Sequence, residues 1–205
     1  MPARKIEEFE FPVGIQQPER TNFRQREGYE VAYLKDDEIP RYRYSAVLGA
    51  GRIAQAMELI FDLLPATVSL IIEESKSDHC GGPCVEVWAG VELRTEIVRQ
   101  VWADHLDLFI HDAMVGIGIA DVEQGFEVSL DCHKILYIYS PCMDVPEKIV
   151  QAVGLKYFKR LPHISDLGYA PLSLRELGRG EDYSEVFEEL RTELGLDFAE
   201  VREGP

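Results

Sequence analysis

Residues 115–139, VGIGIADVEQGFEVSLDCHKILYIY, decide the fold, because apolar side chains in this stretch alternate with polar or small ones at the period of a β-strand. The first strand alternates valine and isoleucine with Gly116 and Gly118, which favours a closely packed helix, rather than a ligand, against its small-residue face. Further strands at 126–130 and 135–139 are joined by a tight connection, and we expect them to form an antiparallel hairpin.

Strands alternate with amphipathic helices upstream of this stretch. The pattern predicts, in order, a strand at 46–48, a helix at 52–64 closed by Pro65, strands at 68–73 and 85–89, and a helix at 92–111. On the second helix Val98, Trp102, Leu106 and Phe109 form one buried stripe. With the strand that follows, this is the β-α-β-β-α-β order of ferredoxin-like folds. We therefore expect an α+β fold, with a ferredoxin-like core order, an additional antiparallel hairpin and C-terminal helices.

Glycine and proline residues, which interrupt helices and strands, divide the chain into three segments. Residues 1–43 are expected to be an extended arm packed on the domain, with a short strand at 29–34. Residues 44–160 form the α+β core, and residues 161–205 hold an irregular connection and a C-terminal helix. The connection, 161–180, is long, and long connections are often functional.

Two capping signals mark the later helices. Asp144-Val-Pro-Glu147 and Asp182-Tyr-Ser-Glu185 each place a carboxylate where it can accept from free helix amides, with a glutamate three residues on. Gly154 and Gly195 are placed to end these helices.

Composition and charge restrict the function. The 205 residues are 46% hydrophobic, enough to support a globular core, and 37 acidic against 21 basic side chains give a net charge of −16. Such a charge repels nucleic acid and anionic membranes but attracts a basic protein partner. No apolar run is long enough to span a bilayer and no secretory signal is recognised, so we expect a cytoplasmic protein with reduced cysteines and no membrane contact.

A glycine turn precedes the first helix. Gly49-Ala-Gly51-Arg-Ile-Ala54, followed by Glu73 at the end of the next strand, resembles the dinucleotide fingerprint of Rossmann domains. By this resemblance Gly49, Gly51 and Ala54 would cradle the phosphates of NAD(P), and Glu73 would bind the ribose. The short, glycine-rich connection between residues 74 and 85 argues against it, because a parallel neighbour needs a longer crossover.

Cysteine and histidine side chains could form a zinc site. His79, Cys80 and Cys84 lie in one loop, and Cys132 and His133, with Cys142, could join them across the sheet. Cys132 and Cys142 are too far apart in the sequence to form a second pair of zinc ligands within one turn. The alternative is that Cys132 is a small hydrophobic residue on the apolar face of its strand.

Two further clusters are weaker candidates. Asp104, Asp107 and His111 share one sector of the second helix, where a ligand or acid–base set is possible but a solvated polar face is favoured. The basic and aromatic residues 156–160 could contact nucleic acid, but an edge strand or loop with its rings inward is favoured.

No complete catalytic constellation is present in the sequence. The leading hypothesis is a non-catalytic, cytoplasmic binding or regulatory domain that recognises a basic protein, or else a small ligand, through its acidic surface and the segment 161–180. The alternative is a nucleotide-dependent oxidoreductase that uses the turn from Gly49 to Ala54. A homodimer is a further expectation.

Overall fold

The computed structural model describes residues 9–16, 22–37, 40–76, 84–167, 169, 171–180 and 182–203. The strands are β1 (Gly28–Leu34), β2 (Arg41–Val47), β3 (Thr67–Lys76), β4 (Cys84–Arg94), β5 (Val115–Asp121), β6 (Phe126–Leu130), β7 (Ile135–Ser140) and β8 (Asp197–Glu203). The helices are α1 (Ala50–Phe61), α2 (Thr95–Asp104), α3 (Leu106–His111), α4 (Asp144–Ala152) and α5 (Tyr183–Leu194).

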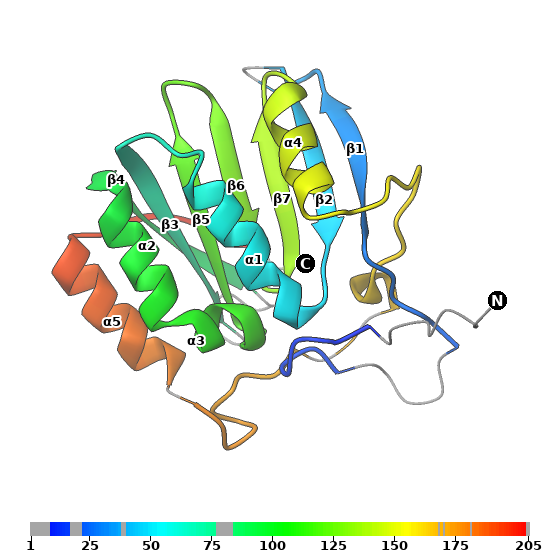
Figure 1. The fold of residues 1–205 in the computed structure, drawn as a ribbon. Helices are drawn as coiled ribbons and strands as arrows, with labels where there is room; N and C mark the ends of the chain where they lie inside the picture. Colours follow the sequence, from blue (N-terminus) through cyan, green and yellow to red (C-terminus); the bar gives the residue numbers. More distant parts are fainter. Residues whose placement is uncertain are drawn as a thin grey trace.

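All these strands form one antiparallel sheet, in the order β1-β2-β7-β6-β5-β3-β4-β8. The helices lie together on one face of it (Figure 1). The predicted α+β class is therefore confirmed. Among the described residues, no helix is long and apolar enough to cross a membrane.

The core lies between the sheet and the helices. Paired positions on adjacent strands, such as Ile72 with Ile117 and Ile119 with Val128, point to this layer together. Its largest fully buried side chains include Tyr44, Ile53, Met57, Ile60, Leu70, Ile72, Trp102, Phe109, Ile117, Ile119 and Phe187. Burying each such side chain stabilises the fold by about 1.5–3 kcal/mol.

The ferredoxin-like strand order is not confirmed. In a split β-α-β unit, the two strands that flank a helix are separated by one strand. The strands β4 and β5 meet this condition, with β3 between them, but β2 and β3 are separated by β7, β6 and β5. The predicted strands and helices follow one another along the chain as expected, but β8 was not predicted and the hairpin of β6 and β7 occupies the middle of the sheet.

The helix predicted at 92–111 was wrong in its start and its continuity. Strand β4 continues to Arg94 through Glu92, whose φ of 55° accompanies a register shift against β3. The helix begins at Thr95 and is interrupted at His105 (φ −114°, ψ 29°). The buried stripe survives this break, since Val98, Trp102 and Phe109 are almost fully buried.

The small residues of β5 face away from the helices, which corrects the expectation of a closely packed helix. A Cβ atom on Gly116 would lie 2.8 Å from Glu73 Oε2, and one on Gly118 would lie 3.2 Å from the Cβ of Ile71. Side chains of the neighbouring strand β3 therefore lie over these glycines, on the sheet face without the helices.

The predictions of the hairpin and of the ends of α5 are confirmed. The hairpin of β6 and β7 is antiparallel. Asp182 caps α5 by accepting from the amide of Ser184, and Gly195 ends the helix with a φ of 62°. Helix α4 differs by one position, because its cap is Met143 rather than Asp144.

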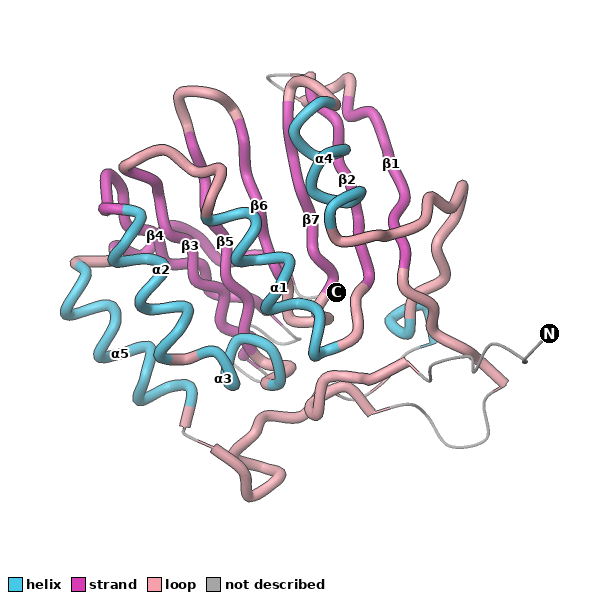
Figure 2. The backbone as a smooth tube through the Cα atoms, in the orientation of Figure 1, coloured by secondary structure: helices cyan, strands magenta, loops and turns pink. Residues whose placement is uncertain are grey.

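The N-terminal arm supplies β1, as expected, and the residues before β1 form a loop along one end of the sheet. Residues 9–16 and the loop before α5 run side by side there (Figure 2). The Gly14 amide donates to His111 O, and the Leu172 amide donates to Gly14 O. A backbone ladder of three segments therefore closes this end of the sheet.

Candidate functional site

A groove lies on the sheet face opposite the helices. Arg43 and Ser45 alternate along β2 with core residues such as Tyr44, so their side chains point to this face. The groove has a volume of about 190 Å³. It is lined by Glu30, Arg43, Ser45, Val47, Ile135, Tyr137, Leu161, His163, Ser165 and Asp166. One wall thus comes from the irregular connection and the floor from β1, β2 and β7.

Side chains rather than a strand ladder position this wall. The Leu161 amide donates to Glu30 Oε2 over 2.8 Å. The buried side chain of Gln25 donates to Pro162 O (2.8 Å) and accepts from the Ile164 amide (3.1 Å). Two polar side chains from the first thirty residues therefore satisfy backbone groups before and at the start of the short 3-10 helix Ile164–Leu167.

Arg43 is the cation of the groove. Its guanidinium lies 5.7 Å from the ring centroid of Tyr137 and donates to the hydroxyl of Tyr139. Its Nε is buried and without a hydrogen-bond partner, and within the described residues it forms no ion pair. The neighbouring Arg41, in contrast, pairs with Asp37 and Glu127, both at 3.0 Å.

His163 adds a neutral donor to the groove. Its Nδ1 accepts from the Ser165 amide at 3.1 Å and lies 2.8 Å from Ser165 Oγ. The proton of the neutral ring must therefore be on Nε2. Burial, with a smaller contribution from His133, lowers the pKa of His163 to about 4, so the ring is uncharged at neutral pH.

A second polar cluster surrounds the turn between β6 and β7. Lys134 is 2% exposed, its Nζ donates to Val115 O over 2.6 Å, and burial lowers its pKa to about 8. Burial raises the pKa of the nearby Asp131 to about 7. His133 Nδ1 lies 2.6 Å from the Tyr169 hydroxyl, and its Nε2 is buried without a partner.

The arm closes this second cluster. Phe9, Phe11 and Ile15 line a cavity together with His133 and Lys134, and its volume is about 10 Å³. That space holds about one water molecule, which would satisfy a buried polar atom such as His133 Nε2. The geometry therefore fits a closed structural network better than a substrate site.

The amides of the glycine turn already have acceptors. The Gly49 amide donates to Glu27 Oε1 at 3.0 Å, and the Ala50 amide donates to Glu10 O at 2.9 Å. The carboxylate of Glu10 also lies near Gly51. The protein thus supplies a carboxylate and a backbone carbonyl as the acceptors that a phosphate would supply at a helix N-terminus.

The structure does not bring Glu73 to this turn. Ala54 and both glycines belong to α1 or its cap, beside β2, whereas Glu73 lies on β3, four strand spacings or about 19 Å away. Glu73 pairs with Arg202 at 3.0 Å on the other face of the sheet, and burial raises its pKa. The turn and the acid do not form one site.

Only some of the predicted zinc ligands lie among the described residues. His79 and Cys80 lie outside the described residues. Cys84 is buried at the start of β4, whereas Cys132 and His133 lie in the turn before β7. No group of three or more metal-binding side chains occurs among the residues with described positions.

Cys132 is not the apolar strand residue that the alternation suggests. It follows the end of β6, its thiol hydrogen-bonds with Ser75, and burial raises its pKa to about 11. The negative charge of Asp131 raises this pKa further. A thiol with a raised pKa is a poor nucleophile at neutral pH.

The cluster of Asp104, Asp107 and His111 and the basic segment 156–160 lie in different parts of the fold. Asp107 is exposed and lies 3.8 Å from His111 Nε2, while His111 Nδ1 accepts from the Val13 amide. In the segment 156–160, the Phe158 ring lies against Gly28, whereas Tyr157 is 59% exposed. Only part of the expected inward packing of its rings is therefore present.

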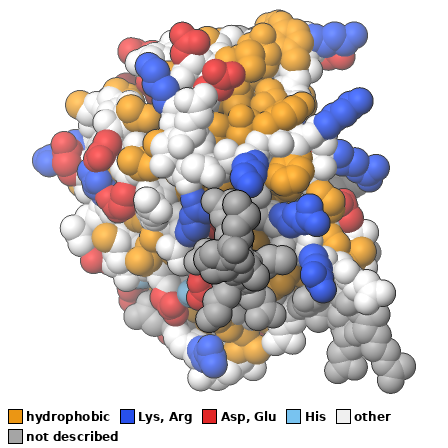
Figure 3. Space-filling view, turned by 45° about the vertical axis from the view of Figure 1, so that its right-hand side comes forward, with side chains coloured by type: hydrophobic (Ala, Val, Ile, Leu, Met, Phe, Trp, Pro, Cys, Tyr) orange, Lys and Arg blue, Asp and Glu red, His pale blue; other side chains and the backbone are white. Residues whose placement is uncertain are grey.

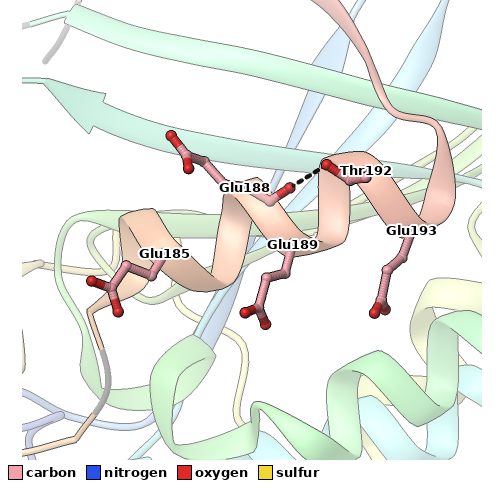
Figure 4. Close-up of a pocket in the computed structure, with 5 residues that line it drawn as sticks. All are labelled: Glu185, Glu188, Glu189, Thr192 and Glu193. Atoms are coloured by element: carbon pink, nitrogen blue, oxygen red, sulfur yellow. Dashed lines mark hydrogen bonds between the residues drawn. The ribbon is translucent and has the colours of Figure 1, made fainter.

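Charge separates across the molecule. Helix α5 presents the carboxylates of Glu185, Glu188, Glu189 and Glu193, three of them on one side (Figure 4). Figure 3, which brings the β1 side forward, shows Lys and Arg side chains beside a hydrophobic area. The end with α5 is acidic and the opposite side is richer in cations.

Comparisons with protein-family models, curated proteins and solved structures found no match for this chain. The site must therefore be judged on its own geometry. The groove residues Glu30, Arg43 and His163 escaped the sequence analysis. The one signal was the alternation in RYRYS (41–45), which places Arg43 and Ser45 on one face, together with the long connection that supplies the wall.

Proposed function

We propose that the protein is a non-catalytic binding domain whose small ligand occupies the groove between the sheet and residues 161–166. The observation that carries the proposal is the side chain of Arg43, which lines the groove, is half-buried and forms no ion pair within the described residues. Among the described residues Arg43 contacts two tyrosines but no carboxylate, so an anionic group on a ligand would be stabilised beside this partly desolvated cation. The neighbouring hydroxyls of Ser45 and Ser165 provide further polar contacts.

Ligand-observed NMR and thermal shift with defined probes test this function. The probes are propionate, succinate and a set of L-amino acids, each at millimolar concentration. At least one should bind the wild type, Arg43→Gln should weaken it at least tenfold, and Arg41→Gln should not. Arg41 is a matched control because it lies on the same face of β2 but already has carboxylate partners. No binding by any probe, or binding unchanged in Arg43→Gln, would overturn the proposal.

A second candidate function is recognition of a basic protein at the acidic end. Strand β8 is at the sheet edge, paired with β4, and it exposes Phe198 (52%) and Val201 (47%). A basic extended segment could add to this edge beside the carboxylates of α5. A Lys-Val repeat peptide should then protect β8 amides from hydrogen exchange, and a Glu-Val repeat should not. Self-association seen by sedimentation would instead favour a homodimer.

A nucleotide-dependent oxidoreductase is the weaker alternative. Glu27 and Glu10 occupy the amides at the start of α1, so a phosphate would have to displace them. If this alternative holds, NAD(P) should raise the melting temperature and Gly51→Asp should abolish that rise. An unchanged melting temperature in NAD(P) would reject it.

A further inference from the structure

We infer that the ligand of the groove is a small zwitterion, an α-amino acid. The inference rests on the proposed function and names the chemistry of its ligand. It follows from the separation of charges around the groove and from its volume.

Opposite charges stand on either side of Ser45. Glu30 is its cross-strand partner on β1, and Arg43 lies two residues along β2 on the same face, about 7 Å away. Asp166 adds a second carboxylate from the opposite wall. A ligand that spans this gap meets a guanidinium at one end and carboxylates at the other.

The carboxylates retain acceptor capacity. Glu30 uses Oε2 for the Leu161 amide, and Asp166 uses Oδ2 for the His163 amide at 3.2 Å. In both groups the second oxygen has no hydrogen bond within the described residues. An ammonium group has three donors and could use both free oxygens.

The space is small, and the apolar residues beneath it offer little accessible surface. Val47, Ile135 and Leu161 are each less than a tenth exposed, and the ring of Tyr137 lies beside them. A volume of about 190 Å³ accommodates a molecule of amino-acid size.

Singly charged ligands fit the groove less well. The groove carries one guanidinium and two carboxylates, while His163 and Tyr137 are neutral at neutral pH. A simple carboxylate would pair with Arg43 but would face Glu30 and Asp166. A simple amine would leave Arg43 unpaired and repelled, so only a zwitterion satisfies both charges.

Isothermal titration with three probes tests the inference on the full chain. L-valine carries both charges, N-acetyl-L-valine lacks the ammonium, and L-valinamide lacks the carboxylate. We expect L-valine, or L-leucine in the same comparison, to bind at least tenfold more tightly than either derivative. If N-acetyl-L-valine binds as well as L-valine, the proposed function stands and the zwitterion is wrong. If none of the probes of either panel binds, both are wrong.

Two variants separate the charges. Glu30→Gln keeps an amide oxygen for the Leu161 amide, so it should preserve the wall while removing most of the preference for L-valine over N-acetyl-L-valine. Arg43→Gln should remove the preference for L-valine over L-valinamide. Far-ultraviolet circular dichroism and melting temperature check the fold of each variant, and Arg41→Gln should keep both preferences. A preference unchanged in well-folded Glu30→Gln and Arg43→Gln would overturn the inference.

Discussion

The carboxylate of Glu30 accepts a hydrogen bond from the backbone amide of Leu161, with 2.8 Å between Oε2 and N. This contact fastens the irregular wall of the groove to the edge strand β1. Replacing Glu30 with alanine would leave a partly buried amide without its acceptor, whereas glutamine supplies one.

We therefore expect Glu30→Ala to lower the free energy of unfolding by about 1–3 kcal/mol and Glu30→Gln to lower it by much less. Urea denaturation measures both. Equal losses in the two variants would mean that the charge, and not the hydrogen bond, holds the wall.

Acid should weaken the wall through His163. Burial lowers its pKa in the folded protein to about 4, below the value of about 6.5 for an unfolded histidine. Between pH 6.5 and 4 the unfolded chain therefore binds a proton that the folded chain resists, and stability falls as the pH falls. The shift corresponds to about 3 kcal/mol at most.

His163→Asn is the variant for this test, because the amide oxygen can accept from the Ser165 amide but does not titrate. The difference in unfolding free energy between wild type and variant should shrink as the pH falls from 6.5 to 4. Parallel pH profiles would contradict the lowered pKa.

The sequence predicted the features that depend on near neighbours. Alternation at 126–130 and 135–139 defines a hairpin, and Asp182 and Gly195 cap α5, because each feature is settled within a few residues. Strand order is different, since it depends on distant pairs such as Ala46 with Leu136. Nothing local indicates that the hairpin inserts between β2 and β5, and so the ferredoxin-like order failed.

The candidate site shows the same limit. The alternation of β2 places Arg43 opposite Tyr44, but a single strand does not reveal which face the helices cover. The wall depends on Gln25 and Glu30, which are separated from residues 161–164 by more than a hundred positions. The motif with Gly49 was visible because it is contiguous, and its amides already have protein acceptors.

Lys134 should make stability rise in mild alkali. Burial lowers its pKa to about 8, against about 10.4 for an unfolded lysine. Between these values the folded chain has lost a proton that the unfolded chain keeps, so this residue contributes increasing stability as the pH rises.

The comparison with Lys134→Met isolates this contribution from the tyrosines and Cys132, which in the unfolded chain titrate over the same range. The unfolding free energy of wild type minus that of Lys134→Met should increase between pH 8 and 10.5 by an amount on the order of 3 kcal/mol. A difference independent of pH would show that the ammonium is not desolvated.

Two glycines near the arm should respond oppositely to alanine. A Cβ on Gly14 would lie 2.4 Å from Leu172 O and 2.7 Å from both Ala113 N and His111 O, all backbone atoms. On Gly51 it would meet only the side-chain oxygen of Glu10, at 3.2 Å.

We expect Gly14→Ala to destabilise the fold by about 1–3 kcal/mol through overpacking. Gly51→Ala lies within α1, where alanine is favoured over glycine, so it should be neutral or stabilising by up to about 1 kcal/mol. Thermal and urea denaturation of the two variants, measured side by side, give the comparison. A stable Gly14→Ala would mean that the arm does not pack against the 111–113 backbone in solution.

Helix α5 should depend on a buried charge pair. Glu74 is 1% exposed and pairs with both Lys76 and Arg191, and the Arg191 guanidinium lies 4.0 Å from the ring centroid of Trp88. Removing Arg191 alone leaves Glu74 buried with one partner and uncovers the Trp88 ring, so Arg191→Leu should cost about 3 kcal/mol or more. In Glu74→Gln/Arg191→Leu the buried charge is gone as well, and the double variant should recover part of this loss.

A double-mutant cycle in urea measures the coupling between Glu74 and Arg191 directly. If the two single losses simply add in the double variant, the ion pair does not hold α5 on the sheet, and its apolar stripe with Phe187 and Leu190 must do so alone.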